Sequence, residues 1–312
     1  MNVLVTGAGL VGCNVARSLK ERGHEPVLYD IAPRESYIQT VAGVVALERG
    51  DIRDLSALVD TLQRHKIETV VHTAYLIGAA LSDRPYTGVR TNVDGAMAVM
   101  EAARLSGVRR FLFASTQGVY NYDIASRPIQ EDLAFSEADH FYIASKVACE
   151  RLLRGFAAAY KLEFAILRFA QIYGRGHYAA GDLAGPVMHE VLTEAIADRP
   201  VRIDPGVLSD NDYVYAKDVA QGVVLACEKP LKNRVYNLGS GFLGTSADVA
   251  DAIRKAVPGT SVEVLSKPVI GPFWIHEQYL DITRAREDLG YSPQFDLVKG
   301  VADFVDELKR NG

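Results

Sequence analysis

Short apolar runs alternate with amphipathic segments through the first half of the chain. The runs have the length and composition of buried strands, and the segments between them repeat apolar residues at helical spacing. This alternation predicts parallel strands joined by right-handed helical crossovers, with helices on both faces of one sheet. We expect strands at residues 2–6, 26–30, 44–47, 69–72, 110–115 and 163–168, and helices at residues 14–22, 55–64, 88–106 and 140–160.

The pattern changes after Arg168. Residues 171–181 are rich in glycine and are expected to form a loop, and Pro186 suits the first residue of a short helix. The fold class is therefore α/β, a Rossmann doubly wound parallel sheet with a smaller, discontinuous α/β lobe. Further along, we expect a strand at 212–215, followed by a helix at 217–228 and a strand at 235–238. The last two return to the main sheet, and Thr245 onward supplies the smaller lobe, with a helix at 283–289 ended by Gly290.

A glycine-rich segment, Gly7-Ala8-Gly9-Leu10-Val11-Gly12, follows the first predicted strand directly and precedes a helical pattern. In this position glycines permit a tight turn, the close approach of a pyrophosphate and close helix packing. The amino end of the helix then supplies N–H donors and the positive end of a dipole. We therefore predict a dinucleotide-binding loop that includes Gly7, Gly9, Leu10, Val11 and Gly12.

The second predicted strand ends in Asp30, 18 residues past Gly12, near the spacing expected for a ribose-binding carboxylate. A carboxylate there repels a 2′-phosphate, so we predict NAD, contacted by Asp30 and Ile31. Arg34 lies close enough to keep NADP as the less favoured alternative. The predicted domains are an NAD-binding Rossmann domain, residues 1–170 plus 216–240, and a substrate-binding lobe, residues 171–215 plus 241–312.

Tyr142-Ile-Ala-Ser-Lys146 lies in a helical pattern downstream of Ser115-Thr116. Side chains four apart share one face of a helix, so the Lys146 ammonium can lie beside the Tyr142 phenol. A neighbouring cation lowers the pKa of a phenol from about 10, which lets it accept a proton from an alcohol. Thr116 can orient that alcohol through its hydroxyl. We predict Thr116, Tyr142 and Lys146 as the catalytic residues.

The same spacing occurs a second time, in Tyr213-Val-Tyr-Ala-Lys217. Here the tyrosine falls in the strand expected at 212–215, and the lysine falls at the start of the next helix. Tyr213 and Lys217 would then not share a helical face, so we interpret this copy as structural.

Composition narrows the class of protein. The 312 residues carry a formal net charge of −5, with a sequence pI of about 5.8, which gives no electrostatic case for nucleic acid. Three widely separated cysteines suit a reducing cytosol. No apolar run is long enough to span a membrane, and Met1 leads straight into a core strand without room for a signal peptide. We expect a cytoplasmic protein without metal, because the seven histidines lack metal-site spacing.

These motifs, in this order and over almost the whole chain, resemble the extended short-chain dehydrogenase/reductases, the NAD-dependent epimerase/dehydratase family. The resemblance implies that Tyr142 is the acid/base, Lys146 its pKa partner and ribose anchor, and Thr116 the substrate-orienting hydroxyl. It also implies a homodimer built on the helices at 88–106 and 140–160. The implied cofactor contacts further include Asp51 and Ile52 at the adenine, Thr73 and Ala74 at the nicotinamide nucleotide, the supporting Asn92, and Phe169.

Three departures from the family pattern bear on the substrate. Gln117-Gly118 stands where sugar-nucleotide dehydratases carry an Asp-Glu pair, so elimination of water lacks its acid and base. Gln171 replaces the usual asparagine, and Asn211 replaces the arginine that clamps a diphosphate in the epimerases. Arg175, Arg202 or Lys267 could substitute for that arginine. The predicted substrate-binding residues are Thr116, Gln117, Tyr142, Gln171 and Arg175.

Two enzymatic functions and one regulatory function remain open at this point. The first is an epimerase that oxidises a secondary alcohol of a sugar or sugar-nucleotide and returns the hydride to the opposite face. The second is an NAD-dependent dehydrogenase of a sugar acid, sugar or amino-acid alcohol without a nucleotide. The third is a non-catalytic NAD-sensing protein, which the presence of all three catalytic residues disfavours.

Overall fold

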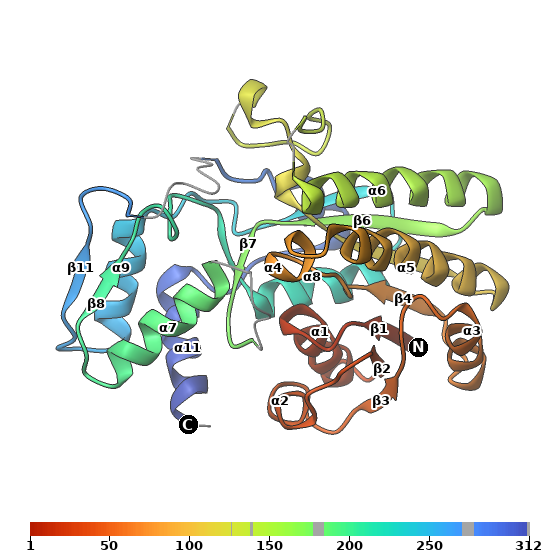
Figure 1. The fold of residues 1–312 in the computed structure, drawn as a ribbon, viewed down its shortest axis with the longest axis horizontal. Coiled ribbons are helices and arrows are strands. Elements are labelled where there is room, and N and C mark those ends of the chain that lie inside the picture. The colour runs from red at the N-terminus through yellow and green to blue at the C-terminus, as the bar shows by residue number, and fades with distance from the viewer. Residues whose placement is uncertain (126, 138–139, 177–183, 270–277, 311–312) are drawn as a thin grey trace.

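The larger lobe is built on a seven-stranded sheet in the order β10-β6-β5-β4-β1-β2-β3, with all neighbours parallel (Figure 1). The structure is a computed structural model that describes residues 1–125, 127–137, 140–176, 184–269 and 278–310. The strands are β1 (Asn2–Thr6), β2 (Glu25–Asp30), β3 (Ala46–Arg49), β4 (Thr69–His72), β5 (Arg110–Thr116), β6 (Glu163–Phe169) and β10 (Val235–Leu238).

Helices cover both faces of this sheet, as the alternation of strands and helices predicts. Successive strand residues point to opposite faces, so Val3 and Val5 pack in one core with α1 and α8, and Leu4 packs in the other with α3, α5 and α6. The helices are α1 (Leu10–Glu21), α2 (Glu35–Val41), α3 (Leu55–Arg64), α4 (Ala79–Ser82), α5 (Pro85–Leu105), α6 (Phe141–Tyr160), α8 (Ala216–Glu228) and α10 (Thr283–Leu289).

A third core, separate from these two, holds the smaller lobe together on the left of Figure 1. Two short parallel pairs, β7 with β9 and β8 with β11, pack against three helices. Residues 280–291 follow the predicted boundary at 241 but pack in a core of the larger sheet. The elements are β7 (Gln171–Tyr173), α7 (Ala184–Ile196), β8 (Val201–Ile203), β9 (Tyr213–Tyr215), α9 (Ser246–Ala256), β11 (Val262–Val264) and α11 (Leu297–Arg310).

The fold class and the strands and helices of the larger lobe are confirmed, and four boundaries are corrected. The first helix begins at Leu10 rather than at residue 14, because the last glycine of the loop lies inside its first turn. The third strand is Ala46–Arg49, two residues later than predicted. Residues 171–173, predicted as loop, form β7 through pairing with β9, a contact that local sequence does not reveal. The helix predicted from Pro186 begins at Ala184.

A buried ion pair joins β6 to α6. Arg168 and Glu150 are 3% and 0% exposed and pair through two contacts, Nε to Oε1 at 3.0 Å and Nη2 to Oε2 at 2.7 Å. Ser115 Oγ, on β5, donates to the same Glu150 Oε1 at 2.6 Å. Three elements thus converge on one carboxylate.

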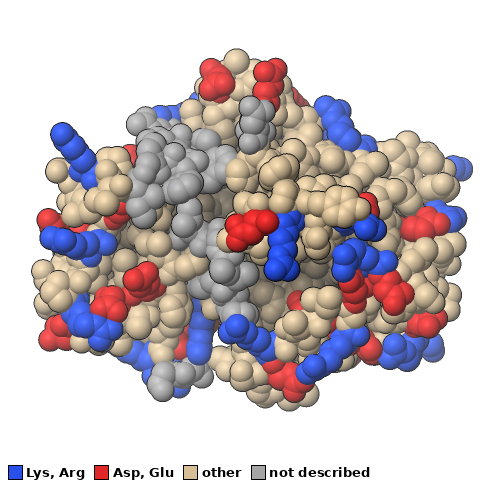
Figure 2. Space-filling view, viewed as in Figure 1, with Lys and Arg blue, Asp and Glu red and all other residues tan. Residues whose placement is uncertain are grey.

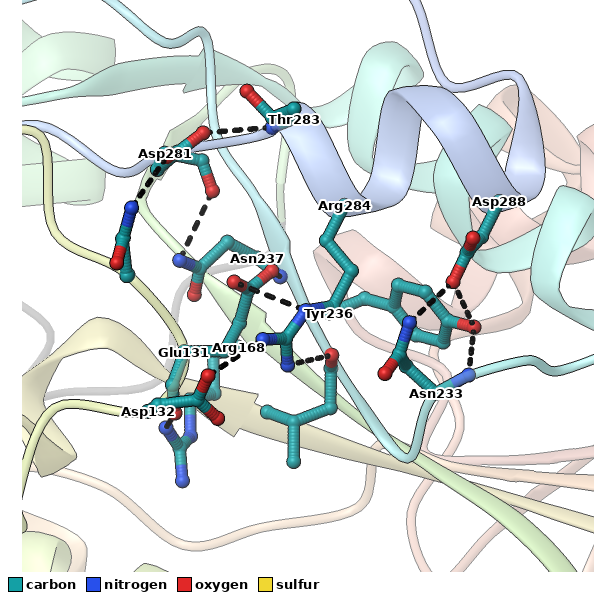
Figure 3. Close-up of polar contacts among 12 residues, drawn as sticks. Glu131, Asp132, Arg168, Asn233, Tyr236, Asn237, Asp281, Thr283, Arg284 and Asp288 are labelled. Atoms are coloured by element: carbon teal, nitrogen blue, oxygen red, sulfur yellow. Dashed lines mark hydrogen bonds and ion pairs between the residues drawn. The ribbon is translucent and has the colours of Figure 1, made fainter.

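The other edge of the guanidinium connects this pair to a wider polar network (Figure 3). Arg168 Nη1 donates to the Glu131 carbonyl at 3.0 Å, and the Glu131 carboxylate accepts from the Asn237 N–H at 3.0 Å. Arg284, on α10, forms an ion pair with Glu131, with its Nε 3.5 Å from Glu131 Oε2. The network therefore ties the segment before α6 to β10 and to the C-terminal part of the chain.

Loss of one partner of the buried pair should destabilise the fold. Arg168→Met leaves the Glu150 carboxylate without its counter-ion, and we expect a loss of about 3–5 kcal/mol in the free energy of unfolding, measured by urea denaturation. Arg199→Met is the control, because Arg199 and Glu194 are 55% and 35% exposed and their pair should contribute about 1 kcal/mol or less. Equal losses in the two variants would contradict this assignment.

Candidate active site

A cavity of 1140 Å³ runs along the carboxyl ends of the central strands. Its lining includes the segments that follow β1, β2, β4, β5 and β6, where open parallel sheets place their ligand crevices. The face shown in Figure 2 carries interspersed Lys, Arg, Asp and Glu around this region, with no field of one sign. The predicted residues that line the cavity are Gly7, Gly9, Leu10, Val11, Gly12, Asp30, Ile31, Asp51, Ile52, Thr73, Ala74, Thr116, Gln117, Tyr142, Lys146, Phe169 and Gln171.

The glycine loop has the tight geometry that its sequence predicts. Gly7 has a φ of +88°, and a Cβ there would lie 2.8 Å from the Ala74 nitrogen. A Cβ on Gly12 would lie 1.8 Å from the Gly7 carbonyl oxygen, so the helix can begin only with glycine at this position. Gly9 caps the amino end of α1, and a Cβ on it would meet open space. The loop therefore leaves room above the helix terminus for a pyrophosphate, which fits a dinucleotide.

Asp30 connects the second strand to this loop. Its Oδ2 accepts a hydrogen bond from the Ala8 N–H at 2.8 Å, and its Oδ1 accepts one from the Ala32 N–H at 2.8 Å. The carboxylate is therefore fixed at the edge of the cavity, where its remaining lone pairs can accept from ribose hydroxyls. Arg34 lines the same end.

The next two strands complete the nucleotide end of the cavity. Thr73 Oγ1 donates to the Thr6 carbonyl at 2.7 Å, which joins β4 to β1 beside the loop. Asp51 pairs with Arg53, and this hydrogen bond lowers the pKa of Asp51. Asn92 is buried and does not line the cavity. Its amide instead accepts from the Leu76 N–H at 2.8 Å and donates to the Leu76 carbonyl at 2.9 Å, so it supports the wall from behind.

Thr116, Tyr142 and Lys146 all line this cavity. Thr116 ends β5, and its Oγ1 accepts from the Gly118 N–H at 3.2 Å. Tyr142 lies in the first turn of α6, whose N-cap His140 accepts from the Tyr142 N–H through Nδ1 at 3.2 Å. Lys146 follows one turn later, as the spacing predicts.

Lys146 is almost completely buried, with 4% of its surface exposed. Its Nζ donates to the Ala114 carbonyl at 2.6 Å and lies 5.7 Å from the centre of the Tyr142 ring. Burial disfavours the charged ammonium and lowers the pKa of Lys146 to about 7. The lysine therefore titrates in the range where an acid/base site must work.

The second copy of the tyrosine–lysine spacing does not assemble a site. Tyr213 lies on β9 and donates to the Ser209 carbonyl, while Lys217 lies on α8 and pairs with Asp303 and Glu307. The prediction that the two residues do not share a helical face is confirmed, while Tyr213 by itself lines the cavity.

The substrate end of the cavity contains amides rather than the expected guanidinium groups. Gln117 Nε2 donates to Asn211 Oδ1 at 2.8 Å, and both side chains line the cavity together with Gln171. The structure does not bring Arg175 into the lining, because its Nη1 donates to the Glu307 carbonyl at 2.8 Å. Arg202 is paired with Glu263 on the surface. The assignment of Arg175 to the substrate is thus not supported by its position.

Two residues that line the cavity near Tyr142 and Lys146 were not predicted from the sequence as site residues. They are His140 and Tyr75. His140 carries the N-cap signal of a residue just before a helix, which could have placed it near Tyr142. Tyr75 directly follows the His72-Thr-Ala74 motif. The pattern of apolar residues around it does not distinguish it from an aromatic residue of the core. Its ring lies against both Lys146 and Tyr142.

Two other features, a cluster of metal ligands and a membrane-spanning helix, are absent from the described part of the chain. Within the described ranges, no three His, Cys, Asp or Glu side chains come together as metal ligands would. None of the described helices is both long enough and apolar enough to cross a membrane.

Comparison with known proteins gives consistent relatives. The model of the NAD dependent epimerase/dehydratase family matches residues 3–239. UDP-glucose 4-epimerase of Mycolicibacterium smegmatis is 32% identical over 100% of this chain and 99% of its own. Two solved structures each cover 99% of both chains at a TM-score of 0.84. They are UDP-glucose 4-epimerase of Thermotoga maritima with UDP-glucose, 27% identical, and UDP-glucose 4-epimerase of Thermus thermophilus with NAD, 26% identical. The chain belongs to the NAD-dependent epimerase/dehydratase family, the extended short-chain dehydrogenase/reductases.

Proposed function

We propose that the protein is an NAD-dependent epimerase that inverts a secondary alcohol of a sugar nucleotide by hydride transfer. The observation that carries this proposal is the convergence of Thr116, Tyr142 and Lys146 on the same cavity as the glycine loop. The UDP-glucose 4-epimerases that match over their full length support the sugar-nucleotide class. Dehydration is disfavoured, because Gln117 and Gly118 supply no carboxylates.

Each catalytic residue has a defined task in this proposal. Thr116 holds the substrate hydroxyl, and the Tyr142 oxygen takes its proton. Tyr142 can accept this proton only as a phenolate, and the Lys146 ammonium stabilises that phenolate by its charge before the proton arrives. NAD, when bound, supplies the nicotinamide that accepts and returns a hydride. In the return direction Tyr142 gives the proton back to the carbonyl oxygen of the keto sugar. The restored alcohol has the opposite configuration because the hydride returns to the other face of the carbonyl carbon.

A dehydrogenase acting on a substrate without a nucleotide is the second candidate. The hydrogen bond between Gln117 and Asn211 favours it. In the epimerases an arginine at the position of Asn211 binds the diphosphate, and the uncharged amides here lack its positive charge. Both candidates use the same three catalytic residues. They differ in whether NAD stays bound through the cycle or leaves as NADH.

NAD rather than NADP is the cofactor in this proposal, because the fixed Asp30 carboxylate repels a 2′-phosphate. The assignments of the other cofactor-lining residues remain part of it. We also propose a cytoplasmic location, which the three cysteines support, since Cys13, Cys149 and Cys227 are all free and buried.

A homodimer through α5 and α6 completes the proposal. These helices pack together along one face of the larger lobe. Their outer surfaces expose Tyr86, Leu105, Phe141, Leu152 and Tyr160, which are between 36% and 76% exposed. Apolar side chains gathered on two adjacent helices favour an interface.

The first prediction concerns the acid/base. Tyr142→Phe keeps the ring but removes the proton acceptor, so epimerisation of UDP-glucose should fall by roughly 10²-fold or more. Binding of NAD, followed by calorimetry, should remain, which separates loss of chemistry from loss of fold. Full activity in this variant would instead contradict the assignment of Tyr142 as the acid/base.

The second prediction separates the two enzymatic candidates. The purified protein is denatured, and the NAD and NADH it releases are quantified. Near-stoichiometric cofactor is expected for an epimerase, whose redox cycle closes within one site. Empty protein that binds added NAD weakly would favour the dehydrogenase and redirect assays to sugar acids and amino-acid alcohols.

The third prediction follows from the buried ammonium. The pKa of Lys146 is about 7 in the folded protein, against an ordinary value of 10.5. Below pH 7 the lysine is charged in both states, and the folded state carries the full desolvation cost. Lys146→Met should then stabilise the NAD-free protein, by up to about 5 kcal/mol at roughly 1.4 kcal/mol per pKa unit, while it abolishes turnover.

This gain should depend on pH in a defined direction. Between pH 7 and 10.5 the folded lysine is neutral while the unfolded one keeps its proton, so the wild type gains stability as the pH rises. The advantage of Lys146→Met should therefore shrink over this window, measured by urea denaturation at pH 6 and pH 9. A difference that is constant with pH would contradict the burial argument.

The fourth prediction tests the dimer. Light scattering should give twice the chain mass of 34.1 kDa for the wild type. Leu152→Glu places a charge on the exposed side of α6 and should shift the mass to that of the monomer. Val44→Glu, at a 73% exposed position away from these helices, should leave the dimer intact.

A further inference from the structure

The Tyr75 ring contacts both catalytic side chains of α6. The Lys146 Nζ is 3.5 Å from the centre of the Tyr75 ring, closer than to the ring of Phe113 at 4.9 Å. The Tyr75 ring meets the Tyr142 ring edge to face, with centroids 5.8 Å apart and planes at 84°. Tyr75 also lines the cavity. One aromatic face therefore covers the buried cation, and the same ring supports the phenol.

The other groups around Lys146 leave its charge weakly compensated. On α6, Cys149 and Glu150 face it, but the Glu150 carboxylate is bound to Arg168 and Ser115. On β4, His72 is buried, and its pKa falls to about 3, so it is neutral. The strand β5 contributes the Ala114 carbonyl and the ring of Phe113. A desolvated ammonium in such a site gains substantially from the negative face of an aromatic ring.

Tyr75 is held in place at its hydroxyl and through the backbone of the next residue. Its hydroxyl donates to Ser145 Oγ at 2.9 Å, and Ser145 Oγ donates to the Tyr142 carbonyl at 2.8 Å. The backbone of the next residue, Leu76, is bound at both its N–H and its carbonyl by the Asn92 amide. These contacts fix the ring, so the cation–π geometry does not depend on a bound ligand.

We propose that Tyr75 is a positioning residue that holds the Lys146 ammonium in its charged form and in register with Tyr142, through its ring face. The inference deepens the proposed function and rests on it for the catalytic roles of Lys146 and Tyr142. The opposing explanation is simple core packing, in which any apolar side chain of similar size would serve. The two differ in one measurable quantity, the titration of Lys146.

The decisive experiment is an NMR titration of ¹³Cε-labelled lysines in the NAD-free protein, with Lys146→Met used to assign the signal. Tyr75→Leu removes the ring face and should lower the titration midpoint of Lys146 by about one pH unit. Tyr75→Phe keeps the ring and loses only the hydroxyl, so its midpoint should stay within about 0.3 of the wild type. An unchanged midpoint in Tyr75→Leu, or equal shifts in both variants, overturns the proposal.

Folding and activity are controlled separately. Circular dichroism verifies each variant, and Tyr75→Met, whose flexible side chain fills irregular space without a ring, replaces Tyr75→Leu if that variant does not fold. With UDP-glucose as the probe, the alkaline limb of the pH–rate profile should move to lower pH in Tyr75→Leu and be restored in Tyr75→Phe. A wild type inactive on UDP-glucose would argue against the proposed substrate class, while the NMR titration still decides the role of Tyr75.

Discussion

The buried pair between Glu150 and Arg168 is the contact on which the active site depends. Tyr142, Lys146 and Glu150 follow one another at intervals of four on α6, so they lie along one face of the helix. Arg168 and Ser115 fix the last of the three to β6 and β5. Because the helix is rigid, this anchor acts together with the packing of α6 against α5 and β5 to set the height of Lys146 and Tyr142 above the end of β5, where Thr116 lies.

The same arrangement leaves the buried Lys146 ammonium without an ion-pair partner in the described part of the chain, and the proposed chemistry depends on this. Glu150 is fully satisfied by Arg168 and Ser115, so it cannot act as a direct counter-ion for Lys146 one turn away. The ammonium is left with a backbone carbonyl and aromatic faces, and burial lowers the pKa of Lys146 to about 7. Because no carboxylate among the described residues pairs with this ammonium, its charge can stabilise the phenolate form of Tyr142 beside it. Part of the stability of the fold is thereby given up for reactivity.

The features that sequence could predict are those that depend on local spacing. The glycine loop, the acid at the end of β2 and the four-residue interval on α6 each specify a geometry within one turn or one strand–helix unit. Tyr75 and the Gln117–Asn211 pair depend on contacts between residues far apart in the chain, which no periodic pattern records. The same reason explains β7, because its pairing with β9 joins segments about forty residues apart. Arg175 was predicted as a ligand from its charge, and its side chain instead contacts the Glu307 carbonyl and does not line the cavity.

The division between local and distant contacts also separates the reaction type, which the family relationship indicates, from the identity of the substrate, which it does not. Acid/base chemistry is set by α6, β5 and the glycine loop, all within the larger lobe, and these match the family in residue and in order. In the proposed function, recognition of the rest of the substrate falls to β7, β9 and the loops of the smaller lobe, where Gln171 and Asn211 depart from the family pattern. An amide such as Asn211 can bind a hydroxyl, a carboxylate or a phosphate oxygen, but it carries no fixed charge. The reaction type is therefore inherited with the larger lobe, and the substrate has to be determined from the amides of Gln171 and Asn211, which the smaller lobe adds to the cavity that Thr116 lines.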